Sequence, residues 1–333
     1  MHAVVEKLLG SEEPSVRFKV LVNVLGRKLH SPEVVKLQDE IRNSERVKTL
    51  LSERGADGRI PLPPYSKWRG AHWVLATLAE IGYPPGDESL VPLREQTLQW
   101  LAGRKKVLVL DGRARWCASI EMNAVLAMLT LGLADERAGG IVERILDLEW
   151  PDGGWNCDKN PAAHVSSFHE TLLPLRALAL YAKLKKSREA KVAAERAAEV
   201  FLKRRLFRRL RDNEVMCPRF LDFHYPRYWH YDVLAGLVAL AEGGFIADKR
   251  CAEALDLVES KQFPGGGWSA DAKWYRVVKR ESGRTSPREF GRTGKAGQSS
   301  LVDWGPIGKT RMNEFVTADA LFVLNAAGRL RLS

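Results

Sequence analysis

The segment QFPGGGW at residues 262–268 has the form Q-x-x-x-G-x-W and follows an amphipathic helical pattern. A near copy, ILDLEWPDGGW at residues 145–155, has Glu149 in place of the glutamine. Glycines at a helix end let the backbone adopt a positive φ and leave the helix, and the tryptophan can cover the exposed end. Two such junctions in one chain indicate a repeated helix–turn–helix unit.

Six strongly apolar segments lie along the chain, each apolar around most of a helical circumference, as in a helix packed on all sides. Most of them end at a glycine, which is a helix-stop signal. Amphipathic segments with charges on one face alternate with them and are expected to lie outside. The apolar segments are residues 16–25, 73–81, 120–133, 172–181, 233–241 and 315–327, and the amphipathic ones are residues 3–9, 34–51, 90–101, 138–148, 189–210 and 252–258.

This alternation predicts an all-α protein, a single (α/α)6 toroid over residues 1–333 with six inner and six outer helices. Closure into a ring gives every apolar helix neighbours on all sides, whereas an open solenoid would expose its apolar end helices unless they were capped. The only β-like run is KVLVL at residues 106–110. An irregular basic excursion is expected at about residues 273–312, which are rich in Gly, Ser, Arg and Lys.

At the level of these repeats, the chain resembles the terpene cyclase and prenyltransferase superfamily over most of residues 65–328. Residues 262–268 match its QW motif, residues 150–180 look like a squalene-cyclase repeat, and residues 228–241 are similar to a prenyltransferase β-subunit helix. The resemblance implies an α/α toroid with a central cavity that binds or transforms an isoprenoid or another large apolar substrate.

The catalytic motifs of that family are missing. Its cyclases use D-x-D-D and its class I synthases D-D-x-x-D, but this chain has no two adjacent aspartates. Its protein prenyltransferases hold zinc with Asp, Cys and His; His230 matches the His, while Ala163 and Val165 stand where the Asp and Cys are expected. One ligand of three cannot hold zinc, so we expect no metal there and no cofactor. A second set of possible ligands, with a spacing that matches no established module, is Cys157, Asp158, His164 and His169.

Polar residues recur at the starts of the apolar segments, where a toroid places the mouth of its cavity. Burial raises the pKa of an acid that faces such a cavity, so the acid can serve as a proton donor, and aromatic faces can stabilise a carbocation. Alternatively, acids at helix starts cap free N–H groups. The catalytic candidates are Glu170, Asp232, His169, His230 and Glu314, with Glu170 and Asp232 preferred, and the substrate-binding candidates are Trp68, His72, Trp73, Trp116, Phe168, Trp229 and Trp304.

The formal net charge of +11 is concentrated at residues 183–211 and 276–295. These patches can contact an anionic membrane surface or a diphosphate, or form the solvated face of an outer helix. No nucleic-acid motif accompanies them, so no nucleic-acid partner is expected. The four scattered cysteines, the lack of an apolar run of about 20 residues and the lack of signal-peptide features favour a cytoplasmic protein.

Three functions are compatible with the sequence. The first is an enzyme that acts on an isoprenoid, and the second is a noncatalytic toroid that binds a lipid, isoprenoid or peptide. The third is a carbohydrate-active (α/α)6 enzyme that uses paired carboxylates such as Glu170 and Asp232. An apolar, aromatic cavity favours the first two, and an open, wet groove with two carboxylates favours the third.

Overall fold

The computed structural model describes residues 2–278 and 298–330, which are mainly helical, and the prediction of an all-α protein is confirmed. Each apolar segment forms a helix, and the first of them continues from an α-helix into a π-helix. These inner helices are α2 (Pro14–Lys19) with η1 (Val20–Val24), α5 (Ala71–Glu80), α7 (Ala118–Thr130), α9 (Phe168–Lys185), α11 (Val233–Glu242) and α13 (Glu314–Ala326).

The amphipathic segments form the outer helices, and short 3-10 helices and strands complete the described residues. The outer helices are α1 (His2–Leu9), α3 (Pro32–Arg42), α4 (Glu45–Leu51), α6 (Val91–Ala102), α8 (Glu136–Asp147), α10 (Arg188–Leu202) and α12 (Ala252–Ser260). The short elements are η2 (Glu88–Leu90), η3 (Pro218–Leu221), η4 (Lys249–Cys251), the antiparallel pair β1 (Leu108–Leu110) and β2 (Arg113–Arg115), and the parallel pair β3 (Arg276–Val277) and β4 (Ser299–Ser300).

Two predicted outer helices differ from the observed ones. Residues 34–51 form two helices because Ser44 starts a new one, its hydroxyl accepting a hydrogen bond from the Val47 N–H. The helix predicted at residues 189–210 ends at Leu202, since Arg205 and Leu206 have positive φ and Leu206 turns into the core. In the predicted excursion at 273–312, the described residues carry only β3 and β4, and residues 279–297 lie outside the described residues.

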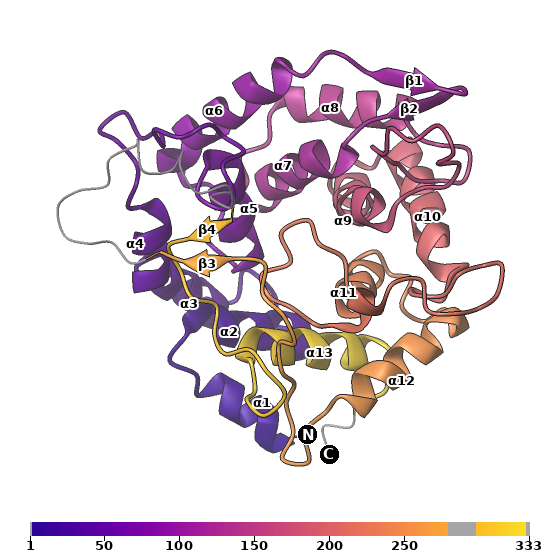
Figure 1. The fold of residues 1–333 in the computed structure, drawn as a ribbon. Coiled ribbons are helices and arrows are strands. Elements are labelled where there is room, and N and C mark those ends of the chain that lie inside the picture. Colours follow the sequence, from indigo (N-terminus) through magenta and orange to yellow (C-terminus); the bar gives the residue numbers. More distant parts are fainter. Residues whose placement is uncertain (1, 279–297, 331–333) are drawn as a thin grey trace.

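Successive inner helices pack on one another: α5 on α7, α7 on α9, α9 on α11, and α11 on α13. Helix α13 packs in turn on α2 and η1, and Lys19 at the end of α2 binds Glu80 at the end of α5. Figure 1 shows these helices around the middle of the molecule, with α6, α8, α10 and α12 outside them. One continuous apolar core includes side chains from every helix from α1 to α13. None of the described helices is both long enough and apolar enough to span a bilayer.

The two glycine–tryptophan junctions have the same structure. The indole N–H of Trp155 donates to the carbonyl of Ile145 at 2.8 Å, and that of Trp268 donates to the carbonyl of Val258 at 2.7 Å. Both tryptophans are fully buried, and each satisfies a carbonyl near the C-terminus of an outer helix. Their backbone N–H groups donate to the threonines of the next inner helices, Thr171 and Thr317. Each junction therefore ties an outer helix to the inner helix that follows it.

Candidate functional site

Long connections lead into the inner helices at one end of the molecule, and short turns leave them at the other. The long connections include residues 103–117, 148–167 and 203–232, and this end is termed the loop end. The short turns include residues 131–135 and 186–187, and that end is termed the turn end. The candidate polar residues lie at the starts of the inner helices and therefore at the loop end.

Glu170, a preferred acid, lies in the first turn of α9 and is buried. One carboxylate oxygen accepts the backbone N–H of Ser119, in the first turn of α7, at 3.0 Å. The other accepts the thiol of Cys157 at 3.2 Å. Burial raises the pKa of Glu170, so the side chain keeps its proton to a higher pH than an exposed glutamate does.

Asp232, the other preferred acid, caps α11: one oxygen accepts the Ala235 N–H at 2.7 Å. The other lies 2.6 Å from Nδ1 of His224, and both side chains are buried. Nε2 of His224 has no partner within the described residues. Sequence reasoning assigned no role to His224, although it stands only eight residues before Asp232 in the same loop. A carboxylate that orients an imidazole leaves Nε2 able to accept a proton or bind a ligand.

The two candidate histidines next to this pair lie among aromatic rings. His230 is buried between Trp229 and Trp274, with ring centroids 4.2 and 4.3 Å from its own. Burial lowers the pKa of His230 to about 2 and also lowers the pKa of His169, whose ring contacts Trp229 at 5.6 Å. Both imidazoles are therefore neutral at physiological pH.

His72 and Glu314 lie on other inner helices. His72, at the start of α5, is fully buried, with Nε2 3.3 Å from the side-chain nitrogen of Asn123 on α7. Burial lowers its pKa to about 3. Glu314 accepts the hydroxyl of Ser11 at 2.8 Å, so it connects α13 to the segment between α1 and α2. Within the described residues, this hydrogen bond does not connect Glu314 to the other candidate acids.

Most of the candidate aromatic residues pack within the loop end. Trp68 stacks on Tyr228 with ring centroids 3.7 Å apart and meets Trp73 edge-on at 4.6 Å. The guanidinium of Arg104 lies 4.9 Å from the ring of Trp116. Five of the six candidate Trp and Phe residues have exposed fractions of 6% or less, namely Trp68, Trp73, Trp116, Phe168 and Trp304. Their contacts are mostly with other protein side chains.

A cavity of about 770 Å³ lies between the inner helices and reaches the turn end. Its apolar lining includes Phe18, Val22, Leu126, Leu173 and Leu180. The loop from Tyr225 to Tyr228 also lines it. None of the twelve residues proposed from the sequence lines this cavity. Trp68 does not line the cavity itself but stacks on Tyr228, which does.

Paired charges form part of the cavity wall. Glu80 accepts hydrogen bonds from Lys19 at 3.1 Å, Arg176 at 3.1 Å and Arg227 at 2.9 Å. Asp319 binds Lys19 and Arg227, and Glu242 binds Arg176. Burial alone would raise the pKa of Glu80, but the three cations outweigh it and lower that pKa. Three cations therefore face three carboxylates within this network.

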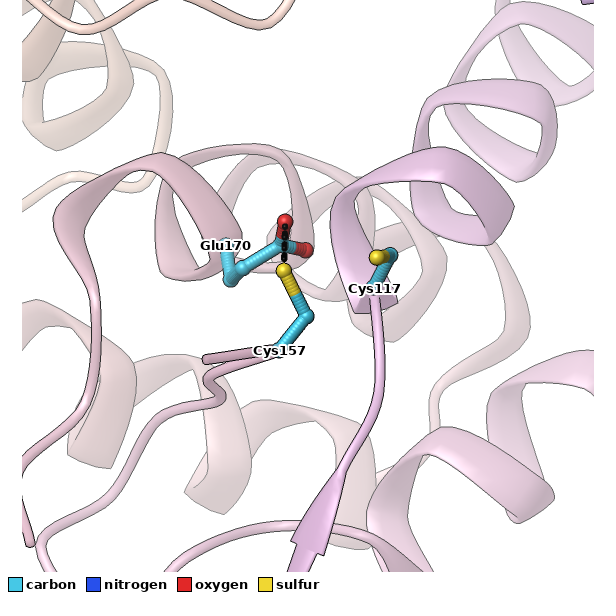
Figure 2. Close-up of side chains that lie close together, drawn as sticks. All are labelled: Cys117, Cys157 and Glu170. Carbon is cyan, nitrogen blue, oxygen red and sulfur yellow. Dashed lines mark hydrogen bonds between the residues drawn. The ribbon is translucent and has the colours of Figure 1, made fainter. Parts of the chain in front are cut away.

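The loop end also brings together two cysteines that are far apart in sequence (Figure 2). Cys117 precedes α7, Cys157 follows Trp155, and both are half-buried next to Glu170. The polar contact with Cys157, aided by Arg104, lowers the pKa of Cys117, whereas that contact and burial raise the pKa of Cys157. Of the ligands considered from the sequence, Asp158 and His164 are exposed and not part of this cluster.

Sequence reasoning treated the cysteines as scattered. The available signal was positional: Cys117 directly precedes an inner helix and Cys157 follows a glycine–tryptophan junction, so both belong to connections at the loop end.

No family model, curated protein or solved structure matches the chain.

Proposed function

We propose that this protein is a closed (α/α)6 toroid whose central cavity binds a large apolar small molecule of the isoprenoid class. Closure is supported by the packing of α13 on α2 and by the ion pair that joins Lys19 to Glu80. The isoprenoid class is what the repeat resemblance implies. The observation that carries the binding function is the cavity of about 770 Å³ with its aliphatic and aromatic lining.

Leu126 shows that one position of the inner helix α7 faces the cavity and not the packed core. Its neighbours Val125 and Ala127 on α7 are buried, whereas Leu126 itself is only half-buried and lines the cavity. At the turn end, the exposed side chains of Leu29 and Val35 also line it. Apolar surface left accessible in this way is stabilised when a ligand covers it. An apolar ligand entering from the turn end would cover these side chains.

The charges of the cavity favour binding over cyclisation. A cyclase of the resembled type needs a protonated acid at its cavity. The carboxylates that line this one, Glu80, Glu242 and Asp39, all have cationic partners, and the pKa of Glu80 is lowered. An ionised, paired carboxylate is a poor proton donor. The glycosidase alternative has little support, since Glu170 and Asp232 are both buried and held by protein donors.

The test is ligand binding by a cavity-filling variant. Native mass spectrometry would first look for a co-purified apolar molecule, and a titration with farnesol would then measure affinity. Leu126→Trp places a larger ring in the cavity and should weaken farnesol binding at least about tenfold, a loss of about 1.4 kcal/mol.

Leu184→Trp is the matched control, because Leu184 is exposed at the end of α9 and does not line the cavity. It should bind farnesol like the wild-type protein. Equal binding by Leu126→Trp and wild type, or no bound apolar molecule and no farnesol binding by either, would overturn the proposal.

A further inference from the structure

The cluster of Cys117, Cys157 and Glu170 offers three potential metal ligands from three separate segments. The two sulfur atoms and a carboxylate oxygen lie within 4.8 Å of one another, and Cys157 Sγ is 3.2 Å from the Glu170 oxygen. Figure 2 shows Cys157 joined to Glu170 by their hydrogen bond, with Cys117 beside them at the start of α7. Within the described residues, this is the one group of three or more His, Cys, Asp or Glu side chains whose ligand atoms all lie within 4.8 Å of one another.

The donor set and its spacing suit zinc. Thiolate and carboxylate are ordinary zinc ligands, at about 2.3 Å for sulfur and about 2.0–2.2 Å for oxygen. In a tetrahedral site these distances place the ligand atoms about 3.5–3.8 Å apart. The present arrangement reaches that geometry with side-chain movements of about an ångström, because its longest separation is no more than 4.8 Å.

The surroundings are those of a metal site. The second oxygen of Glu170 is fixed by the Ser119 N–H at 3.0 Å, which orients the carboxylate toward the sulfurs. Two thiolates and a carboxylate carry three negative charges, and a divalent cation together with the nearby Arg104 neutralises most of that charge. Both cysteines are only half-buried, so an ion can enter.

The geometry points to a zinc site formed by Cys117, Cys157 and Glu170, with the fourth tetrahedral position left for water or another small ligand. The site departs from the sequence-based expectation of no metal. It uses neither His230 nor the ligand positions of the resembled prenyltransferases. It is also independent of the proposed function, since none of its three ligands lines the apolar cavity.

A disulfide is the competing use of two neighbouring thiols. It would consume Cys117 and Cys157 and remove the S–H donor that now satisfies the buried Glu170. A metal ion uses all three side chains instead, which is why the cluster favours metal over disulfide.

The experiment uses the full chain, stripped of metal with a chelator under reducing conditions and then titrated with Co²⁺ as a spectroscopic probe. Thiolate ligation gives an intense sulfur-to-cobalt charge-transfer absorption, and Zn²⁺ should displace the cobalt. Elemental analysis of the zinc-loaded protein should find about one ion per chain, and binding should release protons. Cys117→Ser and Cys157→Ser should each weaken metal affinity at least about 100-fold, and Glu170→Gln at least about tenfold.

Cys217→Ser is the matched control, a half-buried cysteine outside the cluster, and should bind Co²⁺ like wild type. Helical circular dichroism of each variant separates lost metal from lost folding, and the near-isosteric Glu170→Gln remains informative if a cysteine variant does not fold. A charge-transfer band unaffected by these substitutions, no band at all, or a Cys117–Cys157 disulfide formed in air with no metal binding by the reduced protein would each overturn the inference. None of these outcomes would affect the farnesol test.

Discussion

The buried polar groups at the two ends of the molecule differ in whether they have partners. In the cavity wall near the turn end, Lys19, Arg176 and Arg227 are each matched with a carboxylate. At the loop end, buried nitrogens of His72, His224 and His230 have no partner among the described residues, and two thiols share one carboxylic acid with a raised pKa. Fully paired charges stabilise a fold and seldom react, whereas unpaired buried groups cost free energy unless they bind or react with something. The apolar cavity and the unpaired buried groups are therefore in different places.

Breaking the paired network should give the largest effect. Asp319→Asn removes the carboxylate shared by Lys19 and Arg227, which leaves two buried cations with only Glu80 as acceptor. We expect it to lower the free energy of unfolding by about 3–5 kcal/mol in urea denaturation. Glu45→Gln, at an exposed pair with Lys48, should cost less than about 1 kcal/mol. If Asp319→Asn lowered the free energy of unfolding by less than about 1 kcal/mol, the paired charges of the cavity wall would not stabilise the fold as proposed.

Acid should weaken the loop end before the cavity wall. The folded-state pKa of His72 is lowered to about 3, below the unfolded value of about 6.5, so its contribution to stability is present above pH 6.5 and is lost as the pH falls toward 3. Between pH 7 and pH 5 this group alone should cost about 2 kcal/mol.

The measurement is the free energy of unfolding against pH. His72→Gln should flatten the decline between pH 7 and pH 5 by about that amount, whatever its stability at pH 7. Because the pKa of Glu80 is lowered, Glu80 in the cavity wall keeps its charge through this range. If the free energy of unfolding fell equally steeply with decreasing pH in His72→Gln and in the wild type, His72 would not be held neutral by the fold.

Thiol reactivity should also differ within the molecule. Contact with the Cys157 sulfur, together with Arg104, lowers the pKa of the half-buried Cys117, while burial raises the pKa of Cys251 to about 12. In metal-free, reduced protein at neutral pH, iodoacetamide should modify Cys117 at least about tenfold faster than Cys251. Peptide mass spectrometry over time gives both rates, and faster modification of Cys251 would contradict the assignment. Added Zn²⁺ should protect Cys117.

The smallest expected effect is the difference in stability between losing an indole N–H that has a hydrogen-bond acceptor and losing one that has none. Trp155 donates to the carbonyl of Ile145, whereas the buried Nε1 of Trp304 has no partner in the described part of the chain. Trp155→Phe and Trp304→Phe lose the same atoms, so the hydrogen bond should make Trp155→Phe more destabilising by about 1 kcal/mol. Urea denaturation of both variants measures the difference. A larger loss from Trp304→Phe would indicate that its indole N–H has a partner, such as an ordered water.

Much of the helical layout follows from the sequence because its signals are local. Apolar periodicity and terminal glycines predict where the inner helices lie, and the spacing of Trp155 and Trp268 predicts equivalent junctions. The helix predicted to reach residue 210 stops at Leu202 for a nonlocal reason. Leu206 is buried in the core, and its carbonyl accepts the hydroxyl of Tyr231, 25 residues further along the same connection. A pattern within one segment carries no information about such a partner.

By itself, the sequence determined an all-α chain of alternating apolar and amphipathic helices, because hydrophobic periodicity is set by neighbours within about two helical turns. It also located polar residues at the starts of the inner helices. Only the tertiary structure decided that Glu170 meets Cys117 and Cys157, that Asp232 orients His224, and that the cavity is lined by other residues. These outcomes depend on how helices far apart in sequence are rotated and packed, and on which buried charges find partners, so they arise only once the chain has folded.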